Sequence, residues 1–160
     1  MQLNEHQTNL VKLLVRHKVV FLVIGGHAVL EYSNYRTTSD LDILLSRSRN
    51  NATKLEQALS RYRVHAPDGR KWVDFLTSKG IKLNYPDETN HEADLLTSID
   101  GIDFGKCYQR SIEVELGDVS LRIPSVSDLI AMKIKSIETG NDIAAKQKDA
   151  MDISELQTLL

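Results

Sequence analysis

Residues 21–30 read Phe-Leu-Val-Ile-Gly-Gly-His-Ala-Val-Leu, and this stretch decides how the rest of the chain is interpreted. The apolar run from Val19 to Ile24 is short, unbroken and rich in β-branched residues, which is typical of a strand buried on both faces. Gly25 and Gly26 then allow a sharp turn, and they let a ligand come close to the main chain. Residues 27–32 can form one or two helical turns, whose first N–H groups would be free to bind a phosphate. The simpler alternative is a tight turn without a ligand.

The next stretch, residues 35–44, reads Tyr-Arg-Thr-Thr-Ser-Asp-Leu-Asp-Ile-Leu and carries two aspartates. Because side chains alternate along a strand, one face is expected to carry Arg36, Thr38, Asp40 and Asp42. Two carboxylates on one face of an apolar strand repel each other unless a positive charge lies between them. Mg²⁺ is usually held by one or two carboxylates together with substrate phosphates. We therefore predict a metal site at Asp40 and Asp42, with a solvated strand edge as the alternative.

Together these motifs resemble the signature of the nucleotidyltransferase superfamily, whose fold is polymerase-β-like. In this chain the signature consists of Gly25-Gly26, thirteen intervening residues, and Asp40-Leu-Asp42. The fuller string, Ile24-Gly-Gly-His-Ala followed by Arg36-x-Thr38-x-Asp40, is similar to the minimal prokaryotic branch. That branch includes nucleotidyltransferases of abortive-infection and toxin–antitoxin systems. The resemblance continues at residues 94–99, 124–133 and 148–153, so it covers roughly residues 19–155.

The resemblance implies an α+β fold, with a mixed sheet and flanking helices. It also implies a Mg²⁺-dependent enzyme that moves an NMP from an NTP such as ATP to a hydroxyl acceptor, at a two-metal site that Mn²⁺ could also fill. The acceptor would be a protein side chain, a tRNA 3′ end or a small molecule, and a toxin or antitoxin would be the partner protein. The alternative function is a nucleotide-binding or interaction module of such a complex that has lost catalysis.

Asp94 is the predicted third carboxylate, in a strand expected over residues 92–99. The resemblance implies that an acid in a downstream strand helps to bind metal and acts as base for the acceptor hydroxyl. Glu92 shares the face of Asp94 by the period of two and is the substitute. The alternative is that Asp94 only ends a loop.

The predicted nucleotide-binding residues are Gly25, Gly26, Arg36, Thr38 and Lys133. Most of the superfamily has Gly-Ser at the glycine pair, so this chain offers only backbone N–H groups at Gly26. Arg36 is expected either to form a salt bridge with Asp40 or to contact phosphate and orient the carboxylates. Lys133 is expected either to extend outward from its helix or to reach the triphosphate.

A length of 160 residues predicts one compact domain. The resemblance implies that it is a nucleotidyltransferase domain, with a core over about 19–125 and C-terminal helices over 125–160. Further helices are expected at 3–17, 52–62 and 72–78, and further strands at 81–85, 112–116 and 119–123. In the last helix, residues 144–160, the expected contacts with the rest of the domain are Ala145, Met151, Ile153 and Leu156.

Composition is that of an ordinary globular protein, with 41% hydrophobic and 26% charged residues and a net charge of −2. This charge gives no sign of a surface that coats nucleic acid or a membrane. A single cysteine, Cys107, cannot form an internal disulfide, which fits a reducing compartment. No apolar run has transmembrane length, so we expect a cytoplasmic protein without membrane contact.

Overall fold

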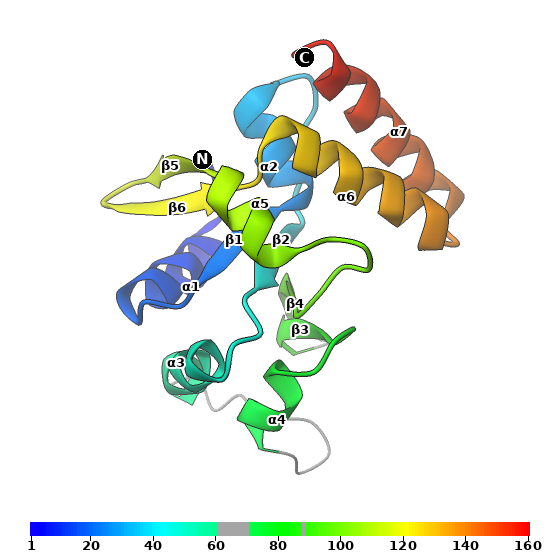
Figure 1. The fold of residues 1–160 in the computed structure, drawn as a ribbon. Helices are drawn as coiled ribbons and strands as arrows, with labels where there is room; N and C mark the ends of the chain where they lie inside the picture. Colours follow the sequence, from blue (N-terminus) through cyan, green and yellow to red (C-terminus); the bar gives the residue numbers. More distant parts are fainter. Residues whose placement is uncertain (61–70, 88) are drawn as a thin grey trace.

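A four-stranded mixed sheet lies at the centre of the structure, a computed structural model that describes residues 1–60, 71–87 and 89–160 (Figure 1). Its strand order is β1-β2-β4-β3. The strands are β1 (Phe21–Ile24), β2 (Leu41–Leu45), β4 (His91–Leu96) and β3 (Lys82–Pro86). The β1–β2 and β3–β4 pairs are antiparallel, and the β2–β4 pair is parallel. The predicted mixed sheet is therefore confirmed.

Helices surround this sheet, and a separate hairpin lies beside it. The hairpin consists of β5 (Ile112–Leu116) and β6 (Val119–Ile123). The helices are α1 (Glu5–Arg16), α2 (Gly25–Tyr32), α3 (Arg49–Ser60), α4 (Trp72–Leu76), α5 (Phe104–Arg110), α6 (Val126–Thr139) and α7 (Ile143–Gln157). In Figure 1, α6 and α7 lie side by side at the end of the molecule opposite α3 and α4.

The two faces of the sheet have different surroundings, because side chains alternate along each strand. On one face Leu41, Ile43 and Leu45 of β2 join the main core, to which α1 and α3 also contribute. On the other face Leu44 packs in a smaller cluster with Met132 of α6 and with residues of α5. Alternation places Asp42 on this second face, between the sheet and the C-terminal helices.

Strand β2 is shorter than the sequence predicts. It begins at Leu41, where the parallel ladder with β4 also begins at the Leu41–Ala93 pair. The expectation that residues 36–40 continue the strand is therefore wrong, because they have no pairing partner in the sheet. Asp40 stands just before the strand, and its position depends on other contacts.

Helix α7 buries two acidic side chains and leaves one of its expected apolar contacts exposed. Met151 is 59% exposed, so its predicted packing role is wrong, whereas Leu156 is fully buried as expected. Asp149 and Asp152 are buried in the same helix, next to cations described below. The predicted helix over 52–62 begins earlier, at Arg49, and its last two residues lie outside the described part of the chain.

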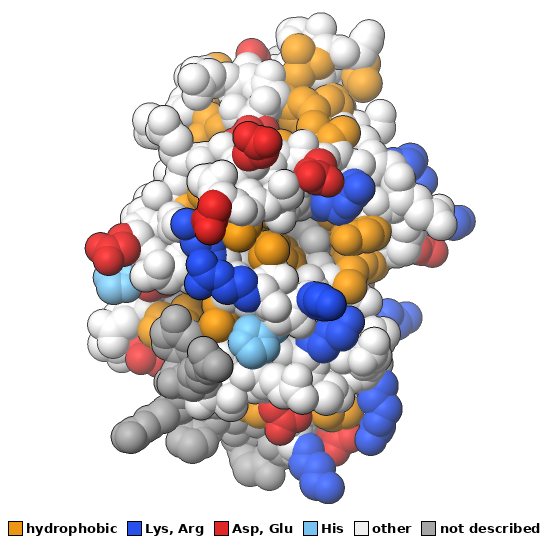
Figure 2. Space-filling model, turned by 90° about the vertical axis from the view of Figure 1, so that its left-hand side faces the viewer, with side chains coloured by type: hydrophobic (Ala, Val, Ile, Leu, Met, Phe, Trp, Pro, Cys, Tyr) orange, Lys and Arg blue, Asp and Glu red, His pale blue; other side chains and the backbone are white. Residues whose placement is uncertain are grey.

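The molecular surface carries charges of both signs. The face formed by α1 and the hairpin shows acidic, basic and hydrophobic side chains interspersed (Figure 2). In the part of the chain that the structure describes, the helices are too short or too polar to cross a membrane.

Candidate functional site

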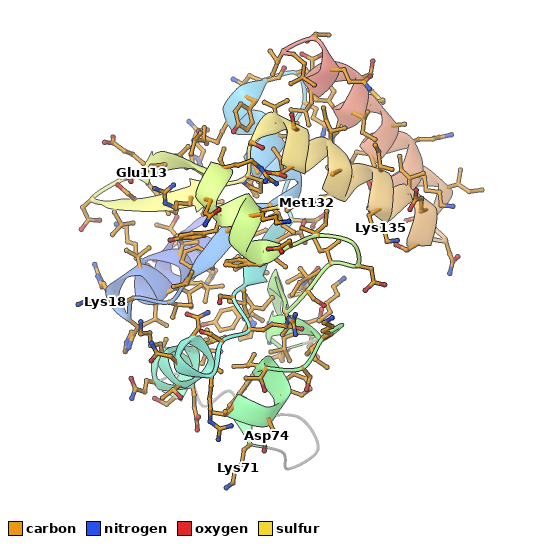
Figure 3. The ribbon with its side chains drawn as sticks, viewed as in Figure 1. Lys18, Lys71, Asp74, Glu113, Met132 and Lys135 are labelled. Atoms are coloured by element: carbon orange, nitrogen blue, oxygen red, sulfur yellow. The ribbon has the colours of Figure 1, made fainter. Side chains whose placement is uncertain are left out.

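A cleft of about 480 Å³ opens between the sheet, the loop after β4 and the two C-terminal helices. Met132 and Lys135 of α6 lie on the side of the helix that faces this loop (Figure 3). The predicted site residues that line the cleft are Gly25, Gly26, Arg36, Thr38, Asp40, Asp42 and Lys133. The structure thus brings seven predicted residues, from three separate segments of the chain, into one cavity.

Gly25 forms the turn between β1 and α2, and its backbone requires glycine. Its φ is +67°, in the left-handed region that other residues rarely adopt. A Cβ at this position would lie 2.4 Å from Oδ2 of Asp42. The carboxylate of Asp42 therefore lies against the backbone at the start of α2, which explains why this position has no side chain.

Asp42 and Asp94 are register partners on the neighbouring parallel strands β2 and β4. Burial raises the pKa of Asp42 to about 6, and the nearby charge of Asp94 contributes to this rise. Lys133 and Lys82 lower this pKa but do not cancel the effect. The two acids thus form a region of negative charge that the protein itself neutralises incompletely.

Asp94 lies within β4 and not at the end of a loop. It is buried, and it is not part of the cleft wall. Its Oδ1 lies 2.7 Å from Nε2 of His91, and its Oδ2 lies 3.2 Å from Nζ of Lys82. The substitute, Glu92, accepts a 3.3 Å hydrogen bond from Nδ2 of Asn4 on the α1 side.

The acids on the cleft wall are suited to a cation whose remaining ligands come from the substrate. Asp40 is exposed, and it lines the cleft together with Asp42. Among the described residues, no three His, Cys, Asp or Glu side chains lie close enough together to hold a metal ion. Two carboxylates with an adjacent open cavity are the arrangement in which Mg²⁺ takes its remaining ligands from water and phosphates.

Thr38 and Arg36 lie directly over the first turn of α2, although neither belongs to a strand. A Cβ on Gly26 would lie 2.7 Å from Oγ1 of Thr38 and 3.1 Å from Nη2 of Arg36. The absence of a side chain at position 26 therefore leaves room for a hydroxyl and a guanidinium beside the N–H groups of the helix start.

Arg36 and Lys133 are both held by the buried acids of α7. The guanidinium donates from Nε and Nη2 to the two oxygens of Asp152, each at 2.7 Å. Nζ of Lys133 lies 2.6 Å from Asp149 and 2.7 Å from Asp152. The predicted Arg36–Asp40 salt bridge and the outward-extended Lys133 are therefore both wrong.

Asp152 is the centre of this network, and it is completely buried. Burial alone would raise its pKa, but hydrogen bonds from Arg36, Lys133 and Tyr35 lower the pKa of Asp152 to about 2. Burial and hydrogen bonding to Asp152 raise the pKa of the Tyr35 hydroxyl to about 12. The carboxylate thus remains ionised and fixes two cations on the cleft wall.

Sequence reasoning missed the partners of the predicted residues. It did not connect Asp152 to Arg36, which is 116 residues away in the chain. It also missed Lys82 and His91 as the basic residues beside Asp94. Alternation along the predicted strand at 81–85 separates Lys82 from its apolar neighbours, but pairing with β4 is visible only in three dimensions.

His27 is a buried residue in the first turn of α2. Within the described part of the chain its Nε2 has no hydrogen-bond partner. Burial lowers the pKa of His27, so the imidazole is neutral at pH 7. The neutral imidazole therefore does not offset the negative charge of the acids nearby.

Comparison with solved structures finds a neighbour described as an antigenic nucleotidyltransferase-like protein from Paracoccidioides brasiliensis. The TM-score is 0.56 at 17% sequence identity, over 98% of this chain and 78% of that chain. No protein-family model and no curated protein matches the sequence. At this identity the likeness concerns the fold, and the expected nucleotidyltransferase-like fold is confirmed.

Proposed function

We propose that this protein is a Mg²⁺-dependent nucleotidyltransferase that moves an NMP from an NTP to an acceptor hydroxyl. The observation that carries the proposal is the Asp42–Asp94 pair, which lies in register on parallel strands next to the glycine turn at Gly25. Two adjacent acids in a partly buried position, with a cleft beside them, have a physical reason to bind a divalent cation.

The residues with suitable donor groups would act together. Asp40 and Asp42 would hold Mg²⁺, with Mn²⁺ as a substitute, and Asp94 would join them once it released His91 and Lys82. The ion would stabilise the negative charge that develops at the α-phosphate. The backbone N–H groups at the start of α2 would bind phosphate oxygens, together with Thr38. Arg36 and Lys133, already fixed by Asp152, would present positive charge to the triphosphate without having to be ordered first.

Bond changes follow from this arrangement. The acceptor oxygen forms a bond to the α-phosphorus, and the bond from that phosphorus to the bridging oxygen breaks, so that pyrophosphate leaves. The carboxylate of Asp94 takes the proton of the acceptor hydroxyl as general base. For this role Asp94 must exchange its present contacts with Lys82 and His91 for a contact with the acceptor.

The acceptor classes remain those that the sequence motifs imply: a protein hydroxyl, a tRNA 3′ end or a small molecule. We also propose, from the same motifs, that the protein works within a toxin–antitoxin pair. This part rests on the resemblance of residues 24–42 and not on the fold.

A second candidate function is a nucleotide-binding module without catalysis. The favouring observation is that both carboxylate oxygens of Asp94 already have basic partners, His91 and Lys82. If these contacts persist when NTP is bound, Asp94 could not act as a base.

Incubation of the purified protein with α-³²P-labelled NTPs and Mg²⁺ tests the proposal, with tRNA, co-purified protein and small-molecule hydroxyls as acceptors. We expect label on one acceptor class, and loss of label in Asp40→Asn and Asp42→Asn. The matched control is Asp74→Asn, an exposed aspartate on α4. Nucleotide binding without transfer to any acceptor would favour the second candidate.

A further inference from the structure

Gln7 of α1 is a polar residue that is almost fully buried, at 2% exposure. Its side-chain nitrogen donates two hydrogen bonds, to the carbonyl oxygen of Ser39 at 2.8 Å and to that of Glu92 at 3.0 Å. Its Oε1 accepts a hydrogen bond from the backbone N–H of Asn4 at 3.3 Å. Both donors and the acceptor of this buried amide are therefore in use.

The two carbonyl groups belong to the two segments that carry the acids. Ser39 immediately precedes Asp40, and Glu92 lies two residues before Asp94. The β2–β4 ladder begins only at the Leu41–Ala93 pair, so Gln7 joins the segments just before the backbone pairing starts. Its side chain thus holds the two segments together next to Asp40, a residue that lies outside the β2–β4 ladder.

The role of Gln7 in helix capping does not explain these two bonds. The capping box of α1 uses the backbone N–H and Oε1 of Gln7, together with Asn4. Nε2 takes no part in it. A glutamate at this position would satisfy the same capping box, so the amide nitrogen has a separate task.

We propose that Gln7 is a positioning residue that fixes Asp40 relative to Asp94 and thereby sets the geometry of the cation site. This inference rests on the proposed function, because it concerns the same acids. Removal of a residue that orients metal ligands without contacting the metal commonly weakens metal affinity by about 10–100-fold. Without Nε2, two carbonyl groups lose their donor, and the segment before β2 is free to shift.

Asn51 provides a matched control at the other end of β2. It is also 2% exposed, and its Nδ2 donates to the carbonyl oxygens of Val20 and Ser46, both at 2.9 Å. It therefore joins the chain before β1 to the chain after β2, as Gln7 joins the segments at the start of β2 and β4. No predicted site residue is adjacent to these contacts.

The test compares Gln7→Met and Asn51→Leu with the wild type in two measurements. Backbone amide exchange, followed by mass spectrometry in peptides covering residues 37–42, reports the position of the segment without any ligand. Mn²⁺ affinity, measured by electron paramagnetic resonance with a non-hydrolysable ATP analogue present, reports the site. Gln7→Glu is the second variant: it retains the acceptor that caps α1 but places a buried carboxylate oxygen against the two carbonyl groups, so both measurements should change as in Gln7→Met.

For Gln7→Met we expect faster exchange over residues 37–42 and an Mn²⁺ affinity at least about tenfold weaker. For Asn51→Leu we expect neither change, although it also loses stability. Equal behaviour of the two variants in both measurements would overturn the proposal, as would faster exchange with unchanged Mn²⁺ affinity. If the wild type binds no Mn²⁺, the proposed function fails, and the exchange data alone then decide whether Gln7 holds the segment.

Discussion

Asp42 stands opposite Asp94 in the parallel β2–β4 ladder, and burial, followed by the charge of Asp94, raises the pKa of Asp42 to about 6. Lys82 and Lys133 reduce this effect without cancelling it. The free protein therefore carries a destabilising charge at the centre of its candidate site, as functional sites often do.

Replacement of Asp42 by asparagine is expected to stabilise the metal-free protein at pH 8. The folded state holds the proton of Asp42 more tightly than the unfolded chain, in which the pKa is 3.8. The stabilising contribution of the protonated acid is thus complete below about pH 4, and it is lost as the pH rises through about 6. An asparagine side chain does not ionise, so it keeps this stabilising contribution at high pH. At pH 8 the free energy of unfolding of Asp42→Asn should therefore exceed that of the wild type by up to about 3 kcal/mol.

Urea unfolding in EDTA at pH 8 and pH 4 measures this difference. The gain should be much smaller at pH 4, where the wild-type acid is largely protonated in the folded state. Asp74→Asn on α4 controls for the loss of one negative charge. A variant less stable than the wild type at pH 8 would show that Asp42 is not under electrostatic strain.

Gly25→Ala is expected to abolish binding of Mg²⁺-ATP. The left-handed backbone disfavours alanine by about 1–2 kcal/mol, and the added Cβ would displace the Asp42 carboxylate. Gly101→Ala is the matched control, because Gly101 has a φ of +77° and no atom of the described residues lies within 4 Å of an added Cβ. Calorimetry should show a loss of stability in both variants, larger in Gly25→Ala because of the added contact with Asp42, with ATP binding lost only in Gly25→Ala. Loss of binding in both would point to a general effect of strain.

The contact between Gly26 and Thr38 predicts a coupled pair of substitutions. Gly26→Ala should destabilise the protein, because its Cβ would lie 2.7 Å from Oγ1 of Thr38. Thr38→Ala removes that oxygen, so the double variant should be more stable than the two single effects predict, by about 1 kcal/mol. Urea unfolding of the four proteins gives the coupling energy. Strict additivity would mean that the backbone at Gly26 relaxes away from Thr38.

Asp152→Asn is expected to destabilise the protein by about 3–5 kcal/mol, because it leaves Arg36 and Lys133 without their shared carboxylate in a buried position. Asp118→Asn breaks the exposed ion pair with Lys12 and should change stability very little. Since the pKa of Asp152 is lowered to about 2, its contribution is present above about pH 4 and is lost as the pH falls through about 2. Thermal unfolding at pH 7 measures the loss of stability in the two variants. Equal effects of the two variants would contradict the central role of Asp152.

The sequence predicts the fold well, because its decisive features are local. The apolar run before Gly25 predicts a buried strand, and alternation through Leu41, Ile43 and Leu45 predicts the core face of β2. Alternation wrongly extends this strand over residues 36–40, because a period of two carries no information about where the pairing with the neighbouring strand begins. Asp40 nevertheless lines the cleft, held through the Ser39 carbonyl by Gln7.

Contacts between distant segments could not be predicted from one sequence. Arg36 pairs with Asp152 and not with the nearby Asp40, because the C-terminal helix brings a fully buried carboxylate to it. The sequence shows two acids in the last helix but not which cations they meet. The role of Gln7 was equally hidden, since an N3 glutamine already has a sufficient explanation in the capping box.

Calorimetric titration of ATP into the wild type and Asp42→Asn, with and without Mg²⁺, tests the central claim most directly. We expect the wild type to bind ATP, or another NTP, only when Mg²⁺ is present, and Asp42→Asn not to bind it. Nucleotide binding that is independent of Mg²⁺, or undiminished in Asp42→Asn, would show that Asp42 does not hold a nucleotide-bound metal ion.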